Sequence, residues 1–243
     1  MPKNRKPHVE KGHDTMSVLN KETSDHLRTR LTKAFEIESR LSSLSSTTSS
    51  EEVASKLRIQ LCEVFSDILL ADTHLSARKD LSGRMWRSCF YGRIGELRSR
   101  IKKGKSKLNK LSKKTNLNAT GSNNNSKEMD NQKKSIEEFE ESLTTFLREA
   151  VILYEYLVDK YLCILKSTSK KKKEGRQTKI EENAENINEI ASLSTTTDAH
   201  VGIIPTLHRL YIHLGDLHRY STSFNSAELS YLKASCLAPG KGL

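Results

Sequence analysis

Apolar residues recur at three- and four-residue spacing in several long stretches of the chain, and polar tracts separate these stretches. The first stretch begins at Ser24 and has its apolar positions at Leu27, Leu31, Phe35 and Leu41. After a turn rich in serine and threonine, a second stripe follows at Val53, Leu57, Leu61, Val64, Ile68 and Leu69. This spacing places apolar side chains on one face of a helix. We therefore predict two amphipathic helices, which the short connection requires to lie antiparallel.

Two longer apolar stretches are predicted to form the centre of the core. One runs from about Ser76 to Lys103, with its buried face on Leu81, Met85, Trp86, Cys89, Phe90, Ile94, Leu97 and Ile101. The other runs from about Ser135 to Lys166 and includes FLREAVILYEYLVDKYLCIL, which is apolar on most faces. With 11 glycines and 4 prolines in 243 residues, the chain has few of the turn-forming residues that bound strands. The predicted fold class is therefore all-α.

Three polar segments are predicted to lack a fixed structure. Residues 1–23 form a tail, and two linkers at 104–133 and 167–198 interrupt a helical domain that spans 24–240. The apolar fraction of the whole chain is 35%, below the ~45–50% of typical globular proteins. Segments of this composition bury too little apolar surface to offset the entropy lost on ordering.

The last apolar stretch, from about Gly202 to Pro239, is predicted to form two helices with a break near 221–226. Over 208–241 it follows the tetratricopeptide pattern of large and small residues. The matching residues are Tyr211, Leu214, Gly215, Ala227, Tyr231, Ala234 and Pro239, with His218 where tyrosine is usual. One repeat cannot bury its own face. The preceding helices, a continuation of the chain or a partner must therefore cover it.

The charge of the chain favours anionic partners. Lys and Arg number 41 against 30 Asp and Glu, which gives a formal net charge of +11. Nine of the basic residues lie in the tract 98–114, and four consecutive lysines occupy 170–173. Either run could contact nucleic acid, whereas a solvated helix end and a soluble linker are the simpler interpretations. No stretch approaches the ~20 apolar residues of a membrane span, so we expect no membrane partner.

The sequence contains no recognisable motif for catalysis, cofactor binding or metal binding. It has no GxSxG, no HExxH and no glycine-rich phosphate loop, so we predict a protein that is not an enzyme and uses no cofactor. His208, His213 and His218 are five residues apart, which turns successive side chains about 140° around a helix. The four cysteines form no CxxC pair. We therefore predict no metal site.

Arg219 and Tyr220 are the candidate phosphate-binding residues, together with Arg87 and Arg93 on the preceding long helix. A guanidinium can hold a phosphate through two parallel hydrogen bonds, and a tyrosine hydroxyl can donate a third. The simpler interpretation is that Arg219 pairs with Asp216, three residues earlier on the same helix face. Spacing alone leaves both interpretations open.

Three segments resemble the N-terminal domain of the telomerase-activating Ever-Shorter-Telomeres-one family, which includes the nonsense-mediated mRNA decay adaptors SMG five, six and seven. They are MWRSCFYGRIGELR (85–98), LHRLYIHLGDLHRY (207–220) and AELSYLKASCLAPGKG (227–242). The resemblance implies a 14-3-3-like domain of antiparallel helix hairpins in which Arg219 and Tyr220 contact phosphate. Tyr91 stands where the SMG-seven type has a lysine. This points to the SMG-five type and implies that Arg87 or Arg93 supplies the second basic contact.

The same resemblance implies a function, partners and a location. The chain would be a non-enzymatic adaptor of nonsense-mediated mRNA decay, cytoplasmic and shuttling to the nucleus, that binds phosphorylated segments of the decay pathway's RNA helicase. Its other partners would be a paralogous SMG-type adaptor, in a heterodimer, and a protein phosphatase. The alternative is a telomere maintenance factor that binds telomerase RNA or telomeric DNA through the tract 98–114. Family members continue into further repeats, and some into a nuclease-like domain, so a truncated chain is expected here.

Overall fold

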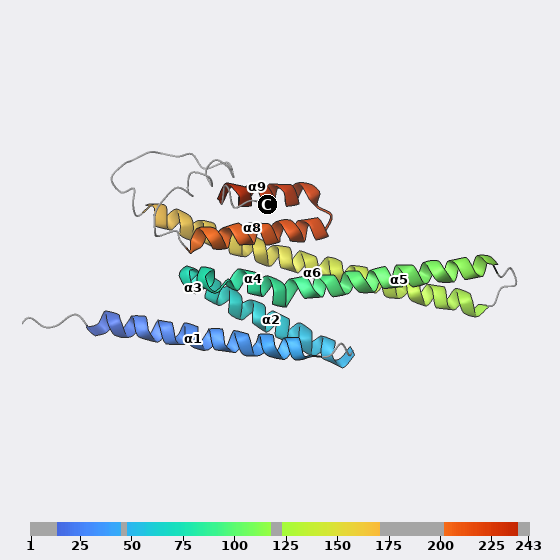
Figure 1. Ribbon diagram of the computed structural model, residues 1–243, viewed down its shortest axis with the longest axis horizontal. Helices are drawn as coiled ribbons and strands as arrows, with labels where there is room; N and C mark the ends of the chain where they lie inside the picture. The colour runs from blue at the N-terminus through green and yellow to red at the C-terminus, as the bar shows by residue number, and fades with distance from the viewer. Residues whose placement is uncertain (1–13, 45–47, 118–122, 171–201, 238–243) are drawn as a thin grey trace, which may run out of the picture.

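The described part of the protein consists of long helices packed side by side. A computed structural model describes residues 14–44, 48–117, 123–170 and 202–237, which contain helices and no strand (Figure 1). Helices α1 (Asp14–Ser43) and α2 (Thr48–Ala71) lie together at one side of the molecule. The short helices α3 (Thr73–Arg78) and α4 (Leu81–Met85) lead through a π-helical turn, η1 (Trp86–Tyr91), into α5 (Gly92–Leu117).

Three further helices follow α5 in the described part of the chain. Helix α6 (Asn123–Lys170) runs back along α5, and α8 (Ile203–Tyr220) packs on α6. Helix α9 (Phe224–Leu237) packs on α8 (Figure 1). The all-α prediction is confirmed for the described residues, as are the α1/α2 pair and the α8/α9 pair. Among these residues, no helix is long and apolar enough to cross a membrane.

Helix α6 supplies the centre of the core. Four of its side chains are completely buried, namely Tyr154, Leu157, Tyr161 and Leu165. The buried hydroxyl of Tyr161 donates a hydrogen bond of 2.7 Å to the backbone carbonyl of Leu69 on α2, which satisfies a polar group that would otherwise destabilise the core. Ile152 and Tyr156 are exposed, so α6 is buried on fewer faces than its sequence predicts.

The single helix predicted from Ser76 to Lys103 is interrupted in the structure. Asp72 caps α3, because its carboxylate accepts a 2.8 Å hydrogen bond from the backbone N–H of Leu75. Asp80 adopts a left-handed backbone conformation, with φ 50°, and its carboxylate accepts a bond from the N–H of Gly83 at the start of α4. Aspartate tolerates that conformation better than most residues. The cap at Asp80 therefore divides the predicted helix, and the cap at Asp72 starts its first part three residues earlier than predicted, at Thr73.

The prediction of a disordered linker at 104–133 is wrong for its described residues, because α5 continues to Leu117 and α6 begins at Asn123. The two helices form a hairpin that projects beyond the rest of the fold (Figure 1). They approach closely at Gly104, where a Cβ atom would lie 2.8 Å from Cγ1 of Ile136. Ion pairs of Lys105 with Glu140 (2.7 Å) and of Lys107 with Glu128 (3.5 Å) also join them. Each helix thus provides the buried surface that the other lacks.

The predicted tail 1–23 is wrong for residues 14–23, whereas the predicted break between the last two helices is confirmed. Helix α1 already begins at Asp14, within the predicted tail 1–23, while residues 1–13 lie outside the described part of the chain. Most of the predicted linker 167–198 also lies outside it. The break between α8 and α9 falls at 221–223, where Thr222 has a φ of 61°.

Replacing Gly104 with leucine is expected to lower the free energy of unfolding by about 1–3 kcal/mol, because the side chain overfills the contact with Ile136. Leucine at Gly95 provides the matched control on the same helix. Nothing lies within 4 Å of a Cβ atom there, so the better helix propensity should raise stability by about 0.5–1 kcal/mol. Urea denaturation of both variants measures the difference. Equal effects of the two changes would contradict the close packing at Gly104.

Candidate functional site

Two arginines from different helices meet at the ring of Tyr220, at the C-terminal end of α8. The guanidinium carbon of Arg98, on α5, lies 5.0 Å from the ring centroid, and that of Arg219 lies 4.6 Å from it. Both distances fall within the range of cation–π attraction. We call Arg98, Arg219 and Tyr220 the arginine–tyrosine cluster.

Asp216 and Tyr231 position Arg219 within this cluster. Nη2 of Arg219 donates a 2.9 Å hydrogen bond to Oδ1 of Asp216, and the hydroxyl of Tyr231 on α9 donates to the same oxygen at 2.9 Å. The Tyr231 ring lies against the backbone of α8 at Gly215, where a Cβ atom would be 2.5 Å from a ring carbon. Gly215 of the predicted repeat pattern thus makes room for the Tyr231 ring. The Tyr231 hydroxyl in turn holds the Asp216 carboxylate that orients Arg219.

Arg219 remains accessible and charged. Its side chain is 47% exposed. Hydrogen bonding to Asp216, and then to Tyr231, raises the pKa of Arg219 further above its already high value. A guanidinium carries five N–H donors, and only one of them is used by Asp216. The simpler interpretation of the sequence, an Arg219–Asp216 pair, is thus correct, and it leaves donors of Arg219 for an anion.

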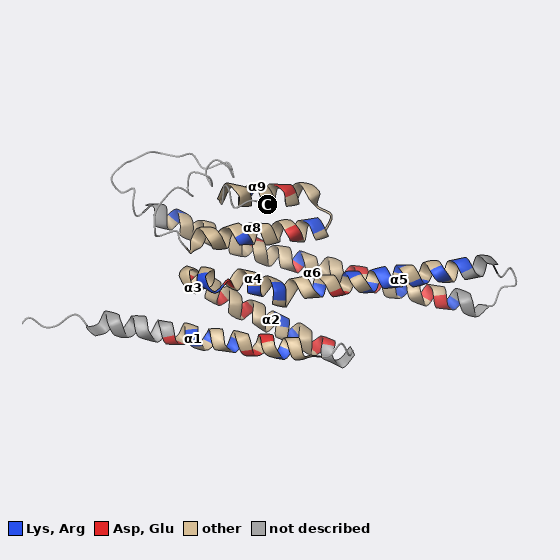
Figure 2. Cartoon of the chain, in the orientation of Figure 1, with Lys and Arg blue, Asp and Glu red and all other residues tan. Residues whose placement is uncertain are grey.

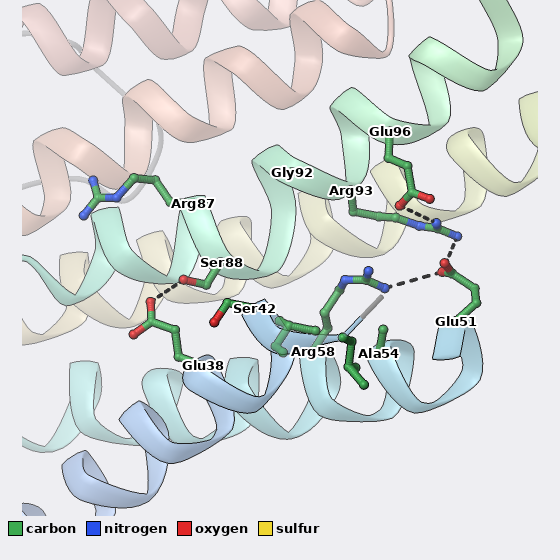
Figure 3. Close-up of a pocket in the computed structure, with 12 residues that line it drawn as sticks. Glu38, Ser42, Glu51, Ala54, Arg58, Arg87, Ser88, Gly92, Arg93 and Glu96 are labelled. Carbon is green, nitrogen blue, oxygen red and sulfur yellow. Dashed lines mark hydrogen bonds and ion pairs between the residues drawn. The ribbon is translucent and has the colours of Figure 1, made fainter. Parts of the chain in front are cut away.

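Arg93 does not reach the cluster. Its side chain is only 13% exposed and pairs with Glu51 of α2 at 2.8 Å and with Glu96 at 3.0 Å. Although partial burial raises the pKa of Glu96, hydrogen bonds and charge from Arg93 and Arg100 lower it below the usual value overall. Figure 3 shows Arg93 extending toward Glu51. Arg93 therefore ties α5 to α2 and is already neutralised by carboxylates.

Arg87 is engaged at the opposite end of α8. Its Nη2 atom lies 3.4 Å from the carboxylate of Asp80, which also accepts a hydrogen bond from Arg209 of α8. In Figure 3 the Arg87 side chain extends away from Arg93. The two arginines predicted to supply the second basic contact are therefore not brought together, and neither has a described contact with Tyr220.

The cavity between α1, α2 and α5 holds a balanced set of charges (Figure 3). It measures about 300 Å³, and its charged lining residues are Glu38, Glu51, Arg58, Arg87, Arg93 and Glu96. Glu38 accepts hydrogen bonds from Ser88 and Arg84, both in or next to η1. Glu51 forms ion pairs with both Arg93, at 2.8 Å, and Arg58, at 3.5 Å. Because its three arginines face three carboxylates, this cavity offers no excess positive charge for an anion.

The sequence prediction missed Arg98 as a member of the site and assigned it only to the basic tract 98–114. The sequence does contain a signal for Arg98, because it follows Tyr91 by seven residues. Seven residues are two helical turns, so the two side chains lie on nearly the same face of the helix. Arg98 can therefore supply the basic contact that Tyr91 does not. By contrast, Arg93 and Arg98 are five residues apart and point to different sides of α5.

Comparison with known families identifies the protein class. A family model described as telomerase activating protein Est1 matches residues 80–225, which is more than half of the chain. The chain belongs to the Est1 family. This non-catalytic family covers adaptors of telomerase and of nonsense-mediated mRNA decay. The match to the Est1 family spans α4 through the first residues of α9, and so includes the whole arginine–tyrosine cluster. A search of the curated proteins found no match.

Proposed function

We propose that this Est1-family chain is a phosphopeptide-binding adaptor of nonsense-mediated mRNA decay, and that Arg98, Arg219 and Tyr220 hold the phosphate. The observation that carries the proposal is the approach of two guanidinium groups to one tyrosine ring. Two nearby cations repel each other, and an anion that contacts both removes that cost. A phosphate suits this role because its oxygens can accept paired hydrogen bonds from guanidinium groups.

Arg98 strengthens the case for an external anion. Among the described residues, no carboxylate lies within ion-pair distance of Arg98, whereas Arg219 has Asp216. Arg98 is exposed on α5, and its guanidinium lies over the Tyr220 ring. The cluster therefore contains more positive than negative charge, in contrast to the balanced cavity beside Arg93.

The finer features of the proposal come from the family resemblance. They are a 14-3-3-like arrangement of the helices, an SMG-five-like subtype, and a phosphorylated RNA helicase as ligand. A paralogous adaptor and a protein phosphatase would be further partners, in a cytoplasmic protein that shuttles to the nucleus. The rival function is telomere maintenance, with RNA or telomeric DNA bound along 98–114. Part of that tract is occupied by ion pairs with α6, at Lys105 and Lys107.

Fluorescence anisotropy with a labelled phosphoserine peptide and its unphosphorylated counterpart tests the proposal. Wild-type protein should prefer the phosphorylated form, and Arg98→Gln should weaken its binding about tenfold or more, the worth of one charge-assisted hydrogen bond. Arg87→Gln removes the same charge from η1 and should change the affinity less than about twofold, since Arg87 pairs with Asp80.

Two results would count against the proposed function. One is equal binding of the two peptides, and the other is an Arg98→Gln variant that binds the phosphopeptide as well as wild type. Binding of single-stranded RNA that is steep in salt and insensitive to Arg98→Gln would favour the telomere alternative.

A further inference from the structure

A groove between α5 and α6 continues directly from the arginine–tyrosine cluster. Its volume is about 570 Å³, and Arg98 belongs both to its lining and to the cluster. Beyond Arg98, the α5 side of the groove carries Lys102 and Lys105, and the α6 side carries one acidic residue, Glu140, with Leu143 and Thr144. Figure 2 shows this part of α5 as a succession of basic residues leading away from the end of α8. A ligand held at the cluster therefore has a basic channel beside it.

The spacing of these lysines matches that of an extended peptide. A helix rises 1.5 Å per residue, which places Lys102 about 6 Å and Lys105 about 10 Å beyond Arg98 along α5. An extended chain advances about 3.3–3.6 Å per residue. With its phosphate at Arg98, a peptide lying in the groove brings its second or third residue to these lysines.

The two lysines differ in their availability. Lys105 pairs with Glu140 across the groove at 2.7 Å. Lys102 is exposed, and none of the described carboxylates lies within ion-pair distance of it. Half-buried Ile101 and Leu143 line the groove beside it and offer apolar contact to the peptide backbone. Lys102 is therefore the cation that a second anionic group on the ligand meets first.

We infer that this groove binds a second anionic group, two or three residues from the phosphoserine, and so selects doubly phosphorylated segments. The inference rests on the proposed phosphate site and names the class of ligand that the site takes. The Lys102 ammonium supplies the second contact, while Glu140 keeps Lys105 neutralised and limits binding of singly charged ligands at that end.

Three labelled peptides of one sequence test this inference by fluorescence anisotropy on the full chain. The first carries one phosphoserine, the second a further phosphoserine two residues away, which matches the position of Lys102, and the third the same group about ten residues away, beyond reach of Lys102. Wild type should bind the second peptide about tenfold tighter than the other two, as one added charge-assisted contact allows. Lys102→Gln should abolish this preference.

Lys103→Gln is the matched control, because Lys103 is the neighbouring exposed lysine of α5 but does not line the groove. This variant should keep the full preference, and circular dichroism checks that both variants are folded. Equal binding of the first two peptides, or a preference unchanged in Lys102→Gln, would overturn the inference and leave the phosphate site standing. No binding of any peptide would overturn both. Displacement of the second peptide by a uridine oligonucleotide at lower concentration than by unlabelled peptide would instead make the groove a nucleic-acid site.

Discussion

Replacing Trp86 with alanine is expected to lower the free energy of unfolding by about 3–5 kcal/mol, the range for loss of a large buried aromatic side chain. Trp86 is 7% exposed and joins three parts of the fold. Its ring stacks on His213 of α8, with centroids 4.8 Å apart and planes at 11°. It also meets the edge of Tyr154 of α6 at 6.1 Å and lies near Phe90 at 6.2 Å. Removing it leaves a cavity where η1, α6 and α8 converge.

Urea denaturation followed by far-ultraviolet circular dichroism measures this loss. Fluorescence is unsuitable, since Trp86 is the only tryptophan in the chain. Tyr91→Ala is the control, because Tyr91 belongs to the same π-helical turn but is 57% exposed. It should cost about 0.5 kcal/mol or less. A loss below about 1 kcal/mol for Trp86→Ala would contradict the central packing of the ring.

Replacing Arg219 with glutamate is expected to weaken binding of the phosphoserine peptide about 100-fold or more, because two changes act together. The substitution removes a donor to phosphate. It also places a second carboxylate beside Asp216, which repels the incoming dianion. Arg219→Gln removes only the donor, so its loss should be nearer tenfold.

The measurement is the anisotropy titration used for Arg98→Gln. Lys160→Glu makes the same change of charge at an exposed residue of α6 and controls for the lowered net charge of the protein. It should shift the affinity by less than about threefold at physiological salt, where distant surface charges are screened. If Arg219→Glu and Lys160→Glu weakened binding equally, the phosphate would not be held by Arg219.

The sequence patterns predict individual helices better than the pairing between them. The break between α8 and α9 could be predicted because small and polar residues interrupt the apolar spacing there. The α5/α6 hairpin could not, since its order depends on Gly104 meeting Ile136 and on Lys105 meeting Glu140. These contacts join positions far apart in the chain, and local composition does not reveal them.

The site was predicted in part for a similar reason. Arg219 and Tyr220 are neighbours in the sequence, so a pattern can place them together. Their partner on α5 depends on the rotation of that helix about its axis. The face that carries Arg93 turns toward Glu51 of α2, and Arg98 lies on the face toward α8. Only the packing of α5 decides between the two arginines.

Because Arg219 is already paired with Asp216, the charge of a ligand decides how much it gains at this site. A ligand carboxylate has the same single charge as the one that Asp216 already presents, so it gains little by competing for Arg219. A phosphate brings close to two charges and three acceptor oxygens, enough to engage Arg98 while the internal pair persists. A peptide with glutamate in place of phosphoserine should therefore bind this protein no more tightly than the unphosphorylated peptide.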